Sequence, residues 1–395
     1  MHVDFFDKDG MPYRLIHNNE ALTLEEILKL NDIPISSVEV SEAENGAYRT
    51  RLLYNTIFKS FKSIPVERVP SKAGDSPIYY TKQFIGFDES GALKRFLFDM
   101  DRDGFGDYIQ STFSDYTLKK NLVEKGDSIL FGFSGGTDST TMLNLLKSTQ
   151  HLPDYDIKAV TVGNLGGTPD KAKISDACAK YGMEHEFIGD NEIITAFNLK
   201  YGVTQTIDSL VRSEKREFAV TTLQHMLVRM LEIKREEGGH NKIMMGLERE
   251  TMINAALAYM LSGEQVAGVS RKTDGENTYI FPLLSLLKKE EQAYIRLAMP
   301  TYRDLDVNNA TDARRYSLYE SGYRGLIMLL AGHLLDVFPG IDIYLENSLE
   351  KIVARSRSSL EFAVCSNCGG RYISVEDTET NMCAACSTLK ETDLI

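Results

Sequence analysis

The sequence predicts an α/β protein with a doubly wound parallel sheet, a small N-terminal α+β domain before it and a metal-binding tail after it. Three observations predict this fold. From about residue 127, apolar strand-like runs alternate with helical stretches; a glycine-rich turn separates the first strand from the first helix; and four cysteines lie in the last 31 residues. Strands that alternate with helices favour one parallel sheet. Such sheets bind ligands at the carboxyl ends of their strands.

A chain of 395 residues is long enough for several domains and a sizeable core. We expect four regions. Residues 1–110 form an accessory α+β domain, and residues 111–290 form the parallel-sheet domain. Residues 291–360 form a helical region, and residues 361–395 form the tail.

The composition favours a protein of the cytoplasm. No apolar run reaches the roughly 18 residues that span a membrane, and the acidic start MHVDFFDKDG is unlike a secretory signal. The net charge of −13 disfavours a general nucleic-acid binder, whose affinity depends on cationic contacts to phosphates. A local basic patch remains compatible with an acidic chain.

The N-terminal region combines strand and helix signals. Residues 21–33 predict a helix, and the alternating pattern of 36–42 predicts a strand. The order strand, hairpin, helix, strand resembles the β-grasp fold of ubiquitin-like sulfur carriers; the alternative is an unrelated accessory domain. Residues 71–110 are turn-rich and β-like, and 112–126 predicts a helix that leads into the next domain.

The parallel-sheet domain is predicted element by element. Its expected strands are 128–133, 157–163, 185–189 and 242–246, and its expected helices are 140–149, 170–182, 217–239 and 250–262. Gly182 and the glycines at 238–239 are typical helix stops. Beyond this domain, the apolar periodicity of 290–360 predicts helices.

The segment 131–140, FGFSGGTDST, follows a strand and opens a helix. Gly135 and Gly136 allow the backbone to approach an anion closely, and the amides of a helix start bind phosphate oxygens. Ser134 and Ser139 add hydroxyl donors. Asp138 suits an anion site if a divalent cation lies between it and the phosphates, and Mg²⁺ prefers such oxygen ligands. The motif is neither a Walker loop nor a G-x-G-x-x-G fingerprint.

On these residues, SGGTDS resembles the SGGxDS signature of PP-loop ATP pyrophosphatases, whose sheet is of the PP-loop or HUP-like kind. The segment 246–263, GLERETMINAALAYMLSG, is similar to a later segment of tRNA 2-thiouridine and 2-thiocytidine thiolases. Phe281–Leu284 with Lys288 or Lys289 and Glu290 resembles their P-L-x(n)-K-E element. The resemblance covers roughly residues 112–390.

The resemblance implies a site for ATP and Mg²⁺. It implies that backbone near Val162 and Gly163 meets the adenine and that the pyrophosphate part of ATP is held by Ser134, Gly135, Gly136, Asp138 and Ser139. It also implies that Lys288 or Lys289 neutralises phosphate charge. The nucleotide-binding residues implied are Ser134, Gly135, Gly136, Thr137, Asp138, Ser139, Val162, Gly163 and Gly246, and the catalytic ones are Asp138, Lys288 and Glu250.

The chain departs from the thiolase pattern at several positions. Thr137 stands where the thiolases usually have lysine, and Glu250 and Thr251 replace an Asp-Asp pair. Glu250 keeps one carboxylate that can hold magnesium or act as a base; a solvated glutamate at a helix start is the alternative. Asn254 replaces a glutamate.

The cysteines depart from the pattern most. No cysteine lies between Cys178 and Cys365, whereas such thiolases use a cysteine pair in this domain. Cys178 lies within an expected helix, so we interpret it as a buried structural thiol.

The last 31 residues carry two C-x-x-C knuckles separated by fourteen residues. Four thiolates at this spacing suit a tetrahedral Zn²⁺ ion in a closed, structural site, so we predict a C-terminal zinc-binding tail with the ligands Cys365, Cys368, Cys383 and Cys386. Arg355, Arg357 and Arg371 lie near these ligands in the sequence; they either contact RNA phosphates or are solvated.

The segment 99–110 resembles a calcium loop. Asp99, Asp101, Asp103, Gly104 and Asp107 occupy positions 1, 3, 5, 6 and 9 of an EF-hand loop, but position 12 is Gln110. The alternative is an acidic turn.

Together these features favour an enzyme that converts ATP to AMP and pyrophosphate and activates a carbonyl or carboxylate oxygen for a sulfur or nitrogen nucleophile. A tRNA-thiolase-like reaction is one interpretation. A carboxylate-adenylating ligase, similar in logic to 7-cyano-7-deazaguanine synthase, is a second, and a catalytically reduced nucleotide-binding subunit is a third. The partners expected are ATP, an acceptor that is tRNA, a small molecule or a protein, a sulfur-carrier protein and a second copy of the chain.

Overall fold

A computed structural model describes a large part of the chain. The described residues are 2–6, 12–16, 38–42, 48–52, 65–69, 76–163, 165, 170–215, 218–261, 268–299, 340–356, 360–374 and 381–395. The chain divides into two compact units. One comprises Met1–Asp101 with Ile327–Leu345, and the other comprises Arg102–Leu326 with Glu346–Ile395.

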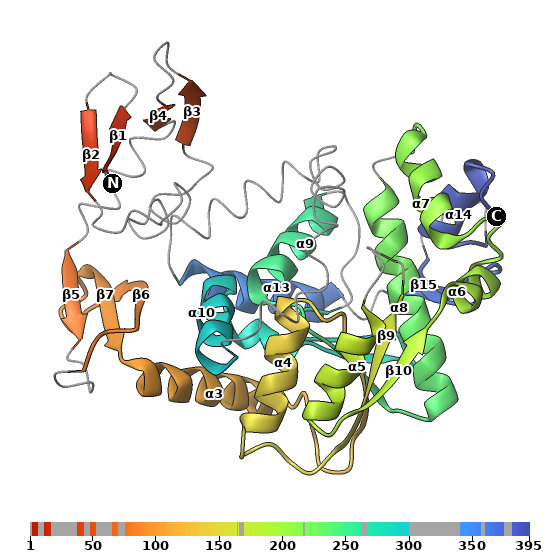
Figure 1. Cartoon of the computed structure of the whole chain (residues 1–395), viewed down its shortest axis with the longest axis horizontal. Helices are drawn as coiled ribbons and strands as arrows, with labels where there is room; N and C mark the ends of the chain where they lie inside the picture. Colours follow the sequence, from red (N-terminus) through yellow and green to blue (C-terminus); the bar gives the residue numbers. More distant parts are fainter. Residues whose placement is uncertain are drawn as a thin grey trace. The chain divides into compact units, whose positions relative to one another are not determined.

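The second unit is built on a six-stranded sheet with the order β10-β9-β8-β11-β13-β12 (Figure 1). Neighbouring strands from β10 to β13 are parallel, and β12 is an antiparallel edge. The strands are β8 (Ser128–Gly132), β9 (Asp156–Val162), β10 (Glu184–Ile188), β11 (Lys242–Met245), β12 (Arg271–Thr273) and β13 (Thr278–Ile280). The chain leaves β8 toward β9 and β10 and later returns to the other side of β8 as β11. This arrangement confirms the predicted doubly wound parallel sheet.

Helices connect these strands. They are α4 (Thr137–Ser148), α5 (Lys171–Lys180), α6 (Asp190–Phe197), α7 (Val203–Arg212), α8 (Ala219–Gly238), α9 (Arg249–Leu261) and α10 (Lys288–Ala298), with a short 3₁₀ helix η3 (Pro282–Ser285). Gly239 ends α8 with a φ of 67°, as its position in the sequence predicted. The sequence did not predict α6, α7, β12 or β13. The two strands have three residues each, too few to show a period.

Helix α3 (Arg102–Lys119) begins earlier than predicted. The expected helix over 112–126 is wrong at both ends. It begins earlier because Phe105, Ile109 and Phe113 are all fully buried and recur at the four-residue spacing of one helical face. It ends earlier, before Asn121, which has a positive φ of 50°. The segment 99–110 forms neither of the two structures that the sequence left open, a calcium loop or an acidic turn, since residues 102–110 are helical. The carboxylate of Asp99 instead pairs with Arg68 and accepts a hydrogen bond from Thr81.

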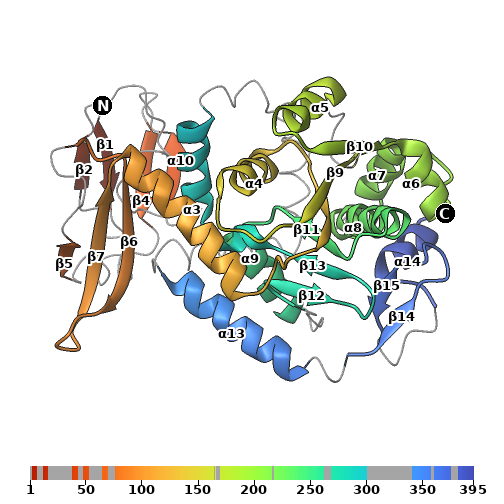
Figure 2. The same ribbon diagram turned by 90° about the horizontal axis from the view of Figure 1, so that it is seen from below.

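The sequence predicted a helical region over 291–360. In the described part of that region the helices are α10 and α13 (Ile341–Ser356). The residues of α13 from Glu346 onward lie beside α3 (Figure 2). The Tyr116 hydroxyl donates to Glu346 at 2.6 Å, and Lys120 pairs with Glu350.

The first unit contains two sheets. A mixed sheet has the order β2-β1-β4-β3, with β1 parallel to β4 and antiparallel to β2. Its strands are β1 (His2–Phe6), β2 (Pro12–Ile16), β3 (Val38–Glu42) and β4 (Tyr48–Leu52). The second sheet has the order β5-β7-β6, with β5 (Val66–Val69), β6 (Tyr80–Phe87) and β7 (Leu93–Met100). The helix expected over 21–33 lies outside the described residues.

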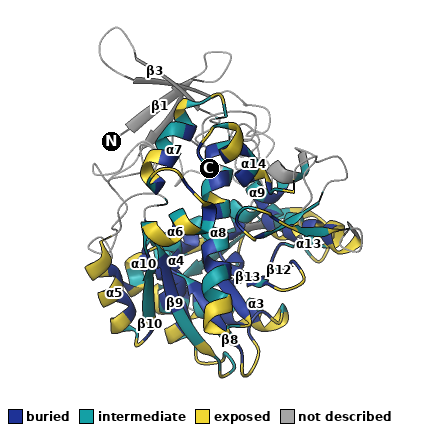
Figure 3. Cartoon of the chain, turned by 90° about the vertical axis from the view of Figure 1, so that its right-hand side faces the viewer, coloured by how far each residue is buried: buried dark blue, intermediate teal, exposed yellow. Residues whose placement is uncertain are grey.

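The core of the second unit is its central sheet and the helix faces that cover it (Figure 3). Ile129, Leu130 and Phe131 of β8 are buried, since a central parallel strand is covered on both faces. Helix α8 packs on β8, β9 and β11, and α4 packs against α10. Within the described part of the chain, no helix has the length and apolar character needed to cross a membrane.

Candidate functional site

The glycine-rich turn lies where β8 ends and α4 begins. Gly135 has a φ of 76°, a conformation that favours glycine, and a Cβ there would lie 3.1 Å from the Ile174 side chain, which would have to shift. Gly136 is the N-cap of α4 and brings no side chain to cap the helix. The Ser134 and Ser139 hydroxyls lie 3.1 Å apart. The turn thus presents hydroxyls and a helix start, the groups that bind phosphate.

Gly246 brings the neighbouring strand to the same place. It follows β11, and a Cβ on it would lie 3.2 Å from the Ser139 backbone nitrogen. Strands β8 and β11 are adjacent, and the connections from them leave in opposite directions. Their carboxyl ends are therefore the crevice where doubly wound sheets bind ligands.

Lys288 reaches this crevice from the start of α10. Its ammonium forms an ion pair with Asp138 in the first turn of α4. Burial disfavours the charge of Lys288, but the nearby carboxylates of Asp138 and Glu291 outweigh burial and raise its pKa. Arg249 helps to position the start of α10. Its guanidinium donates to the carbonyls of Leu284 and Ser285, which lie just before that helix.

Two buried glutamates join this pair, and the sequence did not predict either of them. Glu248 accepts hydrogen bonds from the backbone and hydroxyl of Thr251, yet burial is the larger effect and raises its pKa. Glu291 is fully buried, and its pKa lies well above the ordinary value, first because of burial and second because of Asp138. Its Oε2 lies 3.8 Å from the Lys288 Nζ.

The structure separates the predicted residues into those beside this pair and those elsewhere. Lys288 faces Asp138, whereas Lys289 is exposed. Glu250 lies half-buried in the first turn of α9. Two residues earlier, Glu248 has a pKa on which both Lys288 and Asp138 act. Its place two residues before Glu250, just before a helix, is the one sequence signal that could have revealed it, as a helix-capping acid.

Val162 and Gly163 lie at the carboxyl end of β9, the strand beside β8. The Gly163 amide donates to the Ile188 carbonyl at 2.9 Å. A Cβ on Gly163 would lie 3.1 Å from that carbonyl oxygen. These two residues therefore lie at the same end of the strands as the turn; that they meet an adenine stays a prediction.

The four tail cysteines converge on one point. Their sulfur atoms all lie within 4.8 Å of one another, and all four residues are buried and outside any disulfide. They come from the two knuckles around β14 (Phe362–Val364), β15 (Arg371–Ile373) and the start of α14 (Ala384–Glu391). Four converging thiols fit a single tetrahedral metal ion.

The tail packs on the α6–α8 side of the sheet domain (Figure 1). The Arg229 guanidinium donates to the Cys368 carbonyl at 2.8 Å, and the His225 Nε2 lies 3.1 Å from the Cys383 sulfur. Arg371 pairs with Glu276 of the sheet domain. Its guanidinium is thus held by the protein's own carboxylate. Arg357 lies outside the described residues.

Cys178 is fully buried in α5. Burial raises the pKa of its thiol to about 12. The interpretation of Cys178 as a buried thiol is confirmed.

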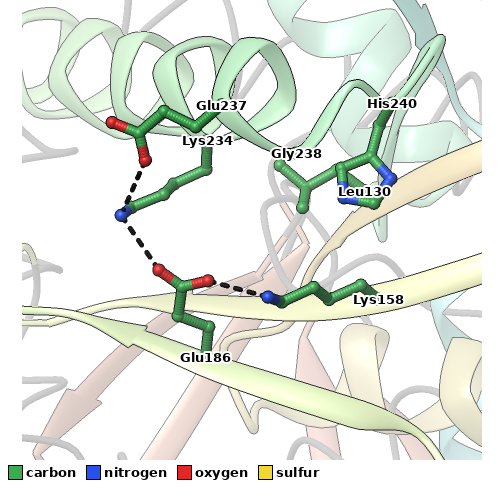
Figure 4. A pocket seen from close by; sticks show the side chains of 7 residues that line it. All are labelled: Leu130, Lys158, Glu186, Lys234, Glu237, Gly238 and His240. Carbon is green, nitrogen blue, oxygen red and sulfur yellow. Dashed lines mark ion pairs between the residues drawn. The ribbon is translucent and has the colours of Figure 1, made fainter.

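A pocket of about 150 Å³ lies between the end of α8 and the strands that this helix covers (Figure 4). Its lining comes from β8, β9, β10 and the end of α8: Leu130, Lys158, Glu186, Lys234, Glu237, Gly238 and His240. Glu186 pairs with both Lys158 and Lys234 at 2.9 Å. The charged side chains of the lining therefore pair with one another, Lys234 also with Glu237.

The parallel sheet with its glycine turn between β8 and α4 is the arrangement that the sequence predicted from its resemblance to PP-loop proteins. Among solved structures, the U34-tRNA thiolase NcsA from Methanococcus maripaludis, seen with its 4Fe–4S cluster, is similar to this chain. The TM-score is 0.50 at 18% sequence identity, over 76% of this chain and 91% of NcsA. At that identity the likeness shows a common fold.

Curated proteins are similar in sequence as well. The tRNA-cytidine(32) 2-sulfurtransferase of Ralstonia pickettii is 27% identical over 183 residues, which are 45% of this chain and 53% of the relative. The tRNA(Ile)-lysidine synthase of Persephonella marina is 26% identical over 257 residues, 62% of this chain and 52% of the relative. The chain spans about half the length of these relatives, and no protein-family model matches it. The comparisons confirm the predicted resemblance to PP-loop proteins and tRNA thiolases.

Proposed function

We propose that the chain binds ATP at the Ser134–Ser139 turn, releases pyrophosphate and transfers AMP to a carbonyl or carboxylate oxygen of an acceptor. The observation that carries this proposal is the ion pair between Asp138 and Lys288 at the phosphate-binding turn. An ammonium and a carboxylate beside a helix start suit a polyphosphate that arrives with a divalent cation.

In this proposal each residue has a limited role. The turn and the start of α4 hold the β- and γ-phosphates, and Lys288 neutralises charge on them as pyrophosphate leaves. Asp138 fits Mg²⁺, because carboxylate oxygens are its preferred protein ligands and the side chain is 28% exposed beside the turn. Bound Mg²⁺ neutralises phosphate charge. Val162 and Gly163 line the adenine side, and Gly246 lets the two strand ends approach.

We propose tRNA as the acceptor. The curated relatives share tRNA in their names but differ in what they install, since one transfers sulfur and the other makes lysidine. The nucleophile is supplied from outside this domain, because the Cys178 thiol is buried and its pKa is raised to about 12. The nucleophile would be either sulfur delivered by a sulfur-carrier protein or the nitrogen of an amine.

We also propose that the cysteine cluster holds Zn²⁺ in a structural role. Four cysteines leave no open coordination position for a substrate. The metal would hold together a segment whose strands have only three residues each.

The test is the nucleotide product. With ATP, Mg²⁺ and bulk tRNA, the purified chain should release AMP and pyrophosphate, and tRNA should stimulate the release. Asp138→Asn should reduce AMP formation by about 100-fold or more. The matched control is Asp176→Asn, which removes an exposed carboxylate on α5. This variant should behave like the wild type.

Two results would contradict the proposal. Formation of ADP in place of AMP would show cleavage at the wrong phosphate. Nucleotide binding without any turnover would favour a catalytically reduced subunit.

A further inference from the structure

Glu291 is buried without the contacts that buried carboxylates normally have. It is 0% exposed, and in the described part of the chain its carboxyl oxygens have no hydrogen-bond donor beside them; the one group close enough to share a proton with it is another carboxyl, that of Asp138. A buried carboxylate without a hydrogen-bond donor is unfavourable, since the hydration that it loses is not replaced. Such a group in a folded chain requires an explanation.

The neighbouring glutamate shows what a structural role looks like. Glu290 accepts hydrogen bonds from the Tyr108 hydroxyl and the Leu287 amide, both at 2.9 Å. It thereby caps α10 and ties it to α3. Glu291, one residue later in the same helix, has no such role, so helix capping and packing do not account for it.

Glu291 is instead directed at the phosphate turn. Its Oε2 lies 3.8 Å from the Lys288 Nζ, and that ammonium pairs with Asp138. Lys288 therefore lies between two carboxylates. Glu248 adds a third acidic group nearby, but Thr251 already occupies its oxygens. One ammonium does not compensate this concentration of carboxylates.

We propose that Asp138 and Glu291 are the two carboxylate ligands of a divalent cation, and that Lys288 holds the cation's place until the cation binds. The inference rests on the proposed function, in which the cation accompanies ATP. Mg²⁺ typically binds one or two carboxylates together with phosphates and keeps several waters, so Glu291 acts directly or through one of these waters. The flexible lysine then turns to the phosphates.

The test measures cation binding itself. Mn²⁺ replaces Mg²⁺ as the probe, and its binding to the full chain is followed by electron paramagnetic resonance, with and without α,β-methylene-ATP. Glu291→Gln keeps the side-chain shape but removes the charge, and it should weaken Mn²⁺ binding by about 10-fold or more. Glu232→Gln removes another buried carboxylate, one that accepts a hydrogen bond from Tyr279 on the sheet, and should leave Mn²⁺ binding unchanged.

Lys288→Met tests the place-holding role independently. Without the competing ammonium, nucleotide-free Mn²⁺ affinity should rise. This variant remains informative even if Glu291→Gln fails to fold.

The outcomes separate the two proposals. If Glu291→Gln binds Mn²⁺ as tightly as the wild type while the wild type forms AMP, the cation site is wrong and the adenylating function stands. If Mn²⁺ binding depends on Glu291 but no AMP forms, the function is wrong and the site stands. Unchanged Mn²⁺ affinity in Lys288→Met would overturn the place-holding role.

Discussion

Lys288 and Asp138 lie 150 residues apart in the sequence and form an ion pair in which the ammonium donates to the carboxylate. A positive charge in the first turn of α10 interacts unfavourably with the helix dipole. The carboxylates beside Lys288 offset this by stabilising its charged form. The pair joins the start of α10 to the start of α4 at the phosphate turn. Four predictions follow from this site and its surroundings.

The first concerns the two adjacent lysines of α10. Lys288→Ala should reduce kcat/KM for ATP by about 100-fold, because the charge that meets departing pyrophosphate is lost. Lys289→Ala is the matched control, since Lys289 is exposed, and should change little. Steady-state release of pyrophosphate measures both. Equal losses in the two variants would mean that overall positive charge, and not the position of Lys288, is what matters.

The second concerns the glycine turn. Gly135→Ala introduces a side chain at positive φ and against Ile174, so it should cost about 1–3 kcal/mol of stability and weaken ATP binding. Gly182→Ala has comparable strain at a φ of 63° but open space around it. It should lower stability and leave ATP affinity intact. Calorimetric titration with ATP and thermal melting measure the two effects separately.

The third concerns the cysteine cluster. The purified chain should contain one Zn²⁺ per molecule, and Cys386→Ser should lose it and melt at a lower temperature. Cys178→Ala should keep its zinc, because Cys178 lies in α5 and outside the cluster. Elemental analysis by mass spectrometry reports the metal content. A zinc-free wild type with an unchanged melting curve would refute the assignment.

The fourth concerns the pH dependence of Glu291. Its pKa is raised in the folded chain mainly by burial and next by Asp138, so folding favours the protonated form. That stabilisation is complete below the ordinary pKa of 4.5 and is lost as the pH rises toward the folded-state pKa. Glu248 shifts in the same direction, and Glu291→Gln removes only the contribution of Glu291.

Without added divalent cation, Glu291→Gln should therefore melt above the wild type at pH 8, by about 2–4 °C for each kcal/mol recovered. The difference should vanish below about pH 4.5, where the wild-type carboxyl is protonated in both states. Melting curves across this range measure it. A gain of the same size at every pH would point to packing and not to charge.

Much of the sheet domain was predictable because its signals are local. The strand β8, the turn after it and helix α4 are encoded within about twenty residues, and the apolar runs of β9 and β11 are those of strands buried on both faces. The two cysteine knuckles likewise predict their own convergence through their spacing. Helix α3 was harder to place, because an acidic turn-like start concealed the spacing of Phe105, Ile109 and Phe113.

The candidate site was only partly predictable, because some of its residues are brought together from distant parts of the sequence. The sequence alone determined the glycine-rich turn, the class of fold, the pairing of the cysteine knuckles and the candidates Asp138 and Lys288, because each depends on neighbours along the chain. Only the tertiary structure decided that Lys288 and not Lys289 faces Asp138, and that Glu248 and Glu291 are buried beside them. In a run of four charged residues such as 288–291, every position reads as solvated. Which face is buried depends on how α10 packs against α4, a contact between segments about 150 residues apart.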